Sequence, residues 1–132
     1  MSGAIARYHH VTHNISRRNV GAARHFYGDV LGLREIEPMG DPRNERLIWF
    51  AIAEQQLHLV IRDQPDVPTS RHFAVLIDDF DSFVSRLEQH GVVMDELKPG
   101  SHWSLRPDGS KVAFCYDPDR NRIELMGSAE VK

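Results

Sequence analysis

One carboxylate stands inside an otherwise apolar strand. Glu124 is flanked by Ile123 and Leu125, and it follows the tight turn that Asp117-Pro118-Asp119 predicts. Because side chains alternate along a strand, Glu124 points away from the face that Ile123 and Leu125 share. The face on which Glu124 lies has two possible explanations. It is either exposed to solvent, or it is the inner wall of a cupped sheet on which Glu124 serves as a ligand.

Three histidines occupy positions that an internal repeat relates to Glu124. Leu57-His58-Leu59 in the first half of the chain matches Ile123-Glu124-Leu125 in the second half. The opening strand of each half also carries a histidine, His10 in the first and His72 in the second. Three imidazoles and a carboxylate suit zinc, nickel, cobalt, manganese or iron, and sequence does not rank these metals. A single strand histidine is better explained as a core or rim residue, so the conjunction of four related positions is what indicates a metal site.

Hydrophobic periodicity predicts the elements that position these four side chains. The first half is expected to form a strand, a helix and three strands, at residues 8–15, 16–31, 33–37, 47–52 and 57–61. The second half repeats that order at residues 71–78, 79–90, 92–97, 112–116 and 122–126. A long loop, 98–110, precedes the last two strands and holds Arg106. The predicted fold class is therefore α+β, with two tandem βαβββ modules.

Length and composition predict one domain, 1–132, with module one at 7–62, a polar linker at 63–70 and module two at 71–127. The net charge of −3 without a basic tract argues against a nucleic-acid partner. Cys115 is the single cysteine, which excludes an internal disulfide and suits a reducing compartment. No signal peptide is recognised, and no apolar run reaches the roughly 20 residues that a membrane helix needs. A cytoplasmic protein without a membrane partner is therefore expected.

The motifs together resemble those of the vicinal-oxygen-chelate superfamily. This glyoxalase-like group includes glyoxalase I, methylmalonyl-CoA epimerase, extradiol ring-cleaving dioxygenases, and fosfomycin and bleomycin resistance proteins. The resemblance extends from Tyr8 to Met126 and rests on five segments: His10-Val11, residues 26–33, Leu57-His58-Leu59, residues 72–75, and Asp117-Pro118-Asp119 leading to Ile123-Glu124-Leu125. It implies a cupped mixed sheet with both helices on the convex side, and a homodimer whose sites can be shared between subunits.

The resemblance also implies a cofactor and a chemistry. The family's metal ligands match His10, His72 and Glu124, and the position that is usually Glu or Gln in glyoxalase I and the epimerase is His58 here. The implied cofactor is a divalent metal ion, and the implied partner is a small oxygenated substrate. Such a metal stabilises the charge that forms when a proton leaves the carbon next to a carbonyl. The candidate bases are Glu124 and, if it is not a ligand, His58, which could otherwise simply line the pocket.

Two departures from the family pattern bear on the activity. Glutathione-dependent glyoxalase I has an Arg four residues after the first ligand, and Asn14 stands there in this chain. Extradiol dioxygenases have a Tyr about ten residues before the ligating Glu, and Phe114 stands there. The expected function is lyase or isomerase chemistry by proton transfer next to a carbonyl. The alternatives are a metal-free protein that binds an antibiotic or other small molecule, and an Fe(II) ring-cleaving dioxygenase.

Overall fold

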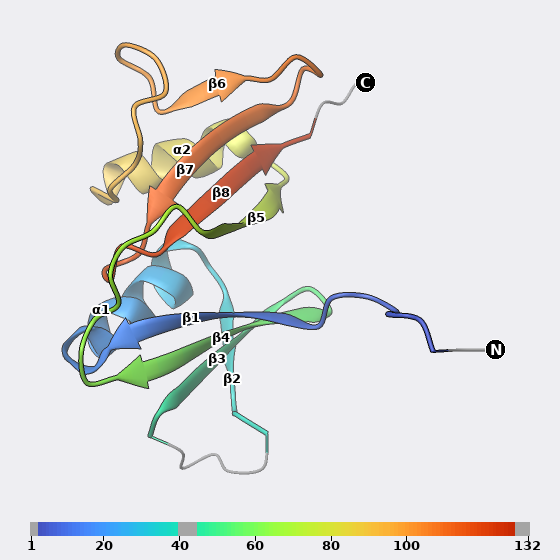
Figure 1. The fold of residues 1–132 in the computed structure, drawn as a ribbon. Helices are drawn as coiled ribbons and strands as arrows, with labels where there is room; N and C mark the ends of the chain where they lie inside the picture. Colours follow the sequence, from blue (N-terminus) through green and yellow to red (C-terminus); the bar gives the residue numbers. More distant parts are fainter. Residues whose placement is uncertain (1–2, 40–44, 129–132) are drawn as a thin grey trace.

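The structure, a computed structural model, describes residues 3–39 and 45–128 and places their strands in two four-stranded sheets (Figure 1). The N-terminal half contains β1 (His10–Ser16), the 3-10 turn η1 (Arg17–Asn19), α1 (Val20–Arg24), the π-helical segment η2 (His25–Val30), β2 (Arg34–Ile36), β3 (Leu47–Ile52) and β4 (Gln55–Arg62). The C-terminal half contains β5 (His72–Ile77), α2 (Phe80–Gln89), β6 (Trp103–Leu105), β7 (Lys111–Tyr116) and β8 (Arg122–Gly127). The predicted βαβββ order is confirmed in both modules.

The two sheets have the same internal order. The N-terminal sheet runs β1-β4-β3-β2, and the C-terminal sheet runs β5-β8-β7-β6. β1 is parallel to β4 and β5 is parallel to β8, whereas the other neighbours are antiparallel. Thr12 lies opposite His58 in the first sheet, and Ala74 lies opposite Glu124 in the second. His58 and Glu124 therefore occupy equivalent points of equivalent strands.

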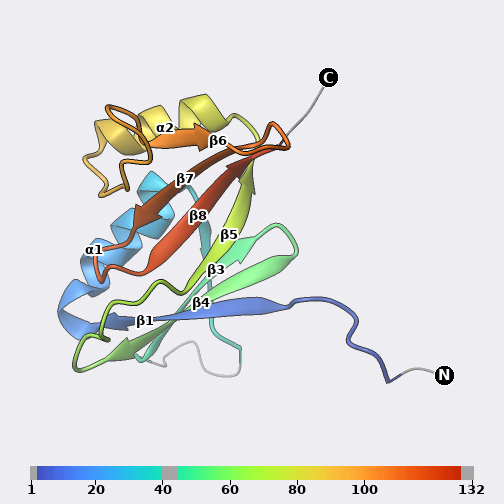
Figure 2. The same cartoon turned by 45° about the horizontal axis from the view of Figure 1, so that its top comes forward.

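Both helices lie on the same side of the strands, as Figure 2 shows. Alternate side chains of β4 and β8 join the helices in one buried core that draws on both modules, including Leu57, Leu59, Ile123 and Leu125 from the strands and Tyr27, Val84 and Leu87 from the helical segments. His58 and Glu124 alternate with these apolar residues and therefore lie on the opposite, open face of each sheet. This is the cupped α+β arrangement that the sequence predicts.

The first helix begins later than predicted. Ser16 remains in β1, where its backbone N–H and its hydroxyl donate to the two carboxylate oxygens of Asp119 at 3.0 and 2.7 Å. The side chain of Asn19 makes no capping bond to α1. The predicted end of this helix at residue 31 fits the structure, because Gly32 follows with a φ of +81°, in the region that favours glycine. Of the helices in residues 3–39 and 45–128, none is long and apolar enough to cross a membrane.

The strand predicted at 92–97 is wrong, and a strand lies instead inside the predicted loop 98–110. Within 92–97 the structure pairs Met94 with Cys115 in an isolated bridge. Pro99 and Gly100 then turn the chain back, with Gly100 at a φ of +74°. β6 follows this turn and pairs with the other end of β7. At this edge of the C-terminal sheet, β7 therefore pairs with a single bridge at one end and with the short strand β6 at the other. Arg106 directly follows β6 and therefore lies next to β7.

Candidate functional site

Glu124 lies on the open face of the C-terminal sheet and is nearly buried, with 7% of its surface exposed. Its Oε1 atom is 3.0 Å from Nε2 of His72, and its Oε2 atom accepts a hydrogen bond from the guanidinium of Arg106. The parallel pairing of β5 and β8 sets the first contact, because His72 lies opposite Arg122 and therefore diagonal to Glu124 on the same face. Both oxygens of this carboxylate are thus engaged.

The other ring nitrogen of His72 fixes the orientation of its imidazole. Nδ1 lies 2.9 Å from the backbone carbonyl oxygen of Ser70, so Nδ1–H donates and Nε2 is directed at Glu124. Metal-binding histidines typically donate their second ring N–H to a carbonyl in this way. The 3.0 Å between Nε2 and Oε1 is close to the separation of roughly 3.4 Å between two ligand atoms of a tetrahedral zinc-like ion. This donor pair fits one edge of a metal site.

The equivalent residues of the N-terminal sheet form an aromatic stack. The ring of His58 lies between Trp49, at a centroid distance of 3.7 Å, and His10, at 3.9 Å. His58 is 8% exposed. Burial, together with the neighbouring imidazoles of His10 and His9, lowers the pKa of His58 from 6.5 to about 4. His58 is therefore neutral at pH 7, which is the protonation state that metal ligation requires.

The structure brings the four predicted site residues together as two pairs. His72 contacts Glu124 in one sheet, and His10 contacts His58 in the other. A cavity of 430 Å³ between β1 and β5 is lined by both His10 and His72, together with Val11 and Phe73. Within residues 3–39 and 45–128, no three His, Cys, Asp or Glu side chains are grouped closely enough to hold a metal ion. The four-ligand site stays a prediction.

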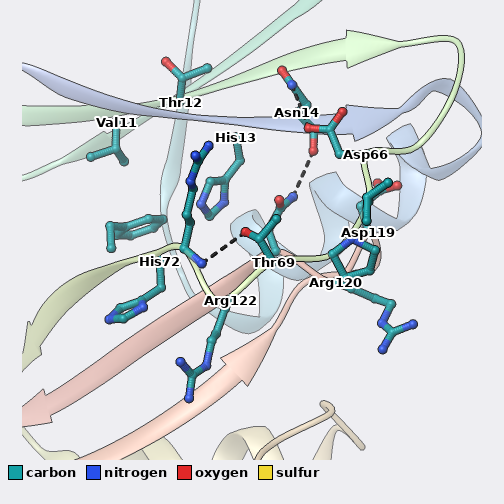
Figure 3. A pocket seen from close by; sticks show the side chains of 15 residues that line it. Val11, Thr12, His13, Asn14, Asp66, Thr69, His72, Asp119, Arg120 and Arg122 are labelled. Atoms are coloured by element: carbon teal, nitrogen blue, oxygen red, sulfur yellow. Dashed lines mark hydrogen bonds between the residues drawn. The ribbon is translucent and has the colours of Figure 1, made fainter.

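A second cavity, of 420 Å³, adjoins the first along the junction between the modules (Figure 3). It is lined by residues 11–14 of β1, the linker, the start of β5, the turn before β8 and the first residue of β8. Asn14 donates to the carboxylate of Asp66 at 2.8 Å across this cavity wall. His72 and Val11 line both cavities, so a ligand near His72 has room to extend toward Asn14 and the linker.

The turn that precedes β8 is held by a buried carboxylate. Asp117 accepts hydrogen bonds from the Tyr27 hydroxyl at 2.7 Å, from the backbone N–H groups of Asp119 and Asn121 at 2.8 Å each, and from the Asn121 amide at 2.8 Å. Since Asp119 also binds Ser16, this turn connects β8 with β1 and with η2. Asp117 and Asp119 therefore have structural roles that position Glu124.

Arg106 is a site residue that sequence reasoning missed as a partner of Glu124. It belongs to a segment expected to be a loop, and eighteen positions separate it from Glu124. Only the register of β6 against β7, and of β7 against β8, brings the two side chains together. Among sequence signals, only the basic character of Arg106 in the loop before β7 could have suggested it.

The two departures from the family pattern also have defined surroundings. Asn14 is bonded to Asp66, so its side chain is already engaged. Phe114 lies opposite Glu124 in the β7–β8 ladder and packs under the Arg122 guanidinium at 3.8 Å and against the edge of His72 at 5.6 Å. Phe114 has no hydroxyl, so it supplies a hydrophobic floor to the site and no proton donor.

Comparison with known proteins defines the class to which this site belongs. A family model for the glyoxalase/bleomycin resistance protein/dioxygenase superfamily matches residues 7–125. The chain belongs to this superfamily, as the repeat and the cupped fold predict. A search of curated proteins gave no match.

Solved structures of the same fold cover almost the whole chain. A putative glyoxalase family protein from Bacillus anthracis is 24% identical, covers 97% of this chain and 99% of its own, and has a TM-score of 0.78. The fosfomycin resistance protein FosX from Listeria monocytogenes is 20% identical over 95% of each chain, with a TM-score of 0.73. Lactoylglutathione lyase from Agrobacterium tumefaciens is 21% identical over 97% of this chain and 96% of its own, with a TM-score of 0.65. These likenesses establish the fold.

Proposed function

We propose that this protein is a metal-dependent enzyme that moves a proton next to a carbonyl of a small oxygenated substrate, in lyase or isomerase chemistry. His10, His58, His72 and Glu124 are the proposed metal ligands. The observation that supports this proposal is the His72–Glu124 pair, in which Nε2 and Oε1 lie 3.0 Å apart while Nδ1 of His72 is anchored to the Ser70 carbonyl. A bound divalent ion would chelate two adjacent substrate oxygens and stabilise the negative charge that develops as the proton leaves.

The chain's own residues bind the substrate and accept its proton in this proposal. The cavity next to His72 takes the reacting part, and the adjoining cavity toward Asn14 takes the remainder of the molecule. Phe114 excludes water beneath the site. Glu124 is the proposed proton acceptor as a carboxylate, and His58 is the alternative acceptor as a neutral imidazole if it is not itself a metal ligand. The engaged side chain of Asn14 argues against glutathione as the thiol partner.

A homodimer in the cytoplasm forms part of this proposal. β1 and β5 are the longer of the outer strands of the two sheets, and their outer backbone groups have no strand neighbour in the described residues. A second copy placed against them would bring the His10–His58 pair of one subunit toward the His72–Glu124 pair of the other. Such an arrangement would complete one four-ligand site from two half-sites.

Metal titration of matched histidine variants tests the proposed function. Protein purified without added metal is loaded with zinc, nickel, cobalt, manganese or iron in turn, and affinity is measured against a chromophoric chelator. His72→Ala should lower affinity at least about 10–100-fold, because loss of groups that merely orient a ligand already costs that much. His102→Ala is the control, since His102 forms an exposed pair with Glu88 at 2.9 Å and should leave affinity unchanged. Equal affinity in the wild type and His72→Ala would contradict the proposal.

A metal-free binding protein is the second candidate. The cavity of 430 Å³ is lined partly by Tyr8, Ile52, Phe73 and Val75, and a mixture of aromatic and aliphatic side chains suits a small apolar ligand. This candidate predicts no change in ligand affinity when a chelator is added. A ring-cleaving dioxygenase receives less support, because Phe114 lacks the hydroxyl that the Tyr of that pattern supplies.

A further inference from the structure

Arg106 is held in a rigid position at the start of the β6–β7 connection. Its backbone N–H donates to the Ser110 carbonyl at 2.9 Å, and its own carbonyl accepts from Gly109 at 2.9 Å. Asp108 closes the same turn by accepting from the backbone N–H and hydroxyl of Ser110 at 2.9 and 2.7 Å. Gly109 has a φ of +90°, which suits this tight turn. The root of the Arg106 side chain is therefore fixed relative to β7.

The guanidinium of Arg106 reaches from this turn across β7 to Oε2 of Glu124. The arginine side chain is 36% exposed and the glutamate side chain is 9% exposed. A carboxylate this buried requires charged or hydrogen-bonding partners, because leaving it unpaired would be costly. Arg106 supplies a full positive charge on one oxygen, while His72 takes the other oxygen. The two oxygens of Glu124 are therefore assigned to different partners.

We propose that Arg106 is a positioning residue that orients the carboxylate of Glu124 for metal binding. It holds Oε2 on the side of the β6–β7 turn and leaves Oε1 directed toward Nε2 of His72. This inference rests on the proposed function, because it concerns the same metal site. It goes further by naming a residue outside the predicted ligand set on which metal affinity depends.

The chemistry of the contact explains why this residue should matter. A free carboxylate can rotate and can bind a cation through either or both oxygens. An arginine forms directional hydrogen bonds with a carboxylate and remains charged at all accessible pH values. Arg106 therefore keeps the plane of the Glu124 carboxylate fixed before a metal binds. Without it, Glu124 would have to be oriented and desolvated during metal binding, and affinity would fall.

Metal affinity of three variants on one hairpin tests this inference. Arg106→Gln removes the charge and keeps much of the side-chain length, and it should lower affinity about 10–100-fold. Arg106→Lys keeps the charge with a different geometry and should recover part of that affinity. Lys111→Ala is the control: Lys111 begins β7, pairs with Asp81 at 2.8 Å and does not touch Glu124, so affinity should be unchanged.

The outcomes separate this inference from the proposed function. If the wild type binds metal and Arg106→Gln binds it equally well, the positioning role is wrong and the metal site stands. If the wild type itself binds none of the metals, both proposals fall. An equal loss in Lys111→Ala would also overturn the positioning role, because it would show that affinity follows hairpin stability. Should Arg106→Gln fail to fold, wild-type affinity in Arg106→Lys would refute the role, and a partial loss would support it.

Discussion

His58 and Glu124 are equivalent by position, but their neighbours differ. Glu124 contacts the guanidinium of Arg106 and the imidazole of His72. His58 is enclosed by the rings of Trp49 and His10, which offer no negative charge, so its neutral form is favoured. One pair therefore contains a carboxylate, and the other contains a neutral imidazole nitrogen. That combination matches the mixed donor set that a divalent ion accepts from imidazole and carboxylate ligands.

The lowered pKa of His58 predicts an acid-sensitive fold in the metal-free protein. Its ordinary value is 6.5 and its folded value is about 4, so between these pH values the unfolded chain binds a proton that the folded chain does not. The stabilisation is fully present above pH 6.5 and is lost progressively as the pH falls toward 4, to a total of roughly 3 kcal/mol.

His58→Phe is the variant that isolates this effect, because a phenyl ring preserves the stack and cannot be protonated. Urea unfolding of the wild type and variant between pH 7.5 and pH 4 would give the free energy of unfolding at each pH. As the pH is lowered, the free energy of unfolding should fall more in the wild type than in the variant. Parallel pH profiles would show that His58 does not titrate abnormally.

The elements that carry the site follow from the sequence where the repeat is strong. The alternation in residues 57–61 and 122–126 assigns His58 and Glu124 to the face opposite the core, and both lie there. The edge strand of the C-terminal sheet was not predicted correctly from the sequence. Residues 92–97 are apolar enough for a strand, but they form only one bridge to β7, and the Pro99-Gly100 turn follows them. Arg106 was missed for the same reason, since its contact with Glu124 depends on that unpredicted register.

Local sequence patterns also do not show which of the four proposed ligands lie next to one another. Period-2 alternation states which face a side chain occupies, but not how the two sheets are angled or where their open edges meet. The sequence therefore predicts the two pairs as members of one site. The structure places His72 with Glu124, and His10 with His58, on separate sheets. The distance between the pairs depends on packing between the modules.

At the level of elements, the contact between β8 and α2 leaves no space for a side chain at Gly127. A Cβ atom there would lie 3.0 Å from both Cβ and Cγ of Phe80 at the start of α2. Gly127→Ala should lower the free energy of unfolding by about 1–3 kcal/mol, because the helix must shift to relieve the overlap. Thermal or urea unfolding would measure this loss.

Gly21→Ala is the matched control for that substitution. Gly21 lies in α1, and a Cβ there would have no atom within 4 Å, so alanine should be neutral or slightly stabilising through its better helix propensity. If Gly127→Ala were as stable as the wild type, the close packing of β8 on α2 would be refuted.

At the scale of the whole molecule, the outer strands β1 and β5 are the surfaces that the proposed dimer would cover. β5 alternates between exposed and half-buried residues along its length, and Leu76 is 68% exposed on its open face. β1 likewise begins with exposed residues, including His10. Long outer strands with exposed apolar side chains are the features that a subunit interface covers. In a symmetric dimer, β1 and β5 of both subunits would be covered, because both subunits use the same surface.

Mixing two inactive variants tests whether the proposed metal site is shared between subunits. His10→Ala damages only module one, and Glu124→Ala damages only module two, so each homodimer should bind metal poorly. If a site combines module one of one subunit with module two of the other, each mixed dimer has one intact site. Random exchange of subunits should then restore about a quarter of the wild-type sites, because half of the dimers are mixed and each has one intact site of two. Equilibrium dialysis after subunit exchange would measure this fraction, with sedimentation confirming the dimer. A site built within one chain would give no recovery, because every chain in the mixture carries a damaged ligand. That result would refute the shared arrangement. The assignment of the ligands would then be tested by the single-variant titrations alone.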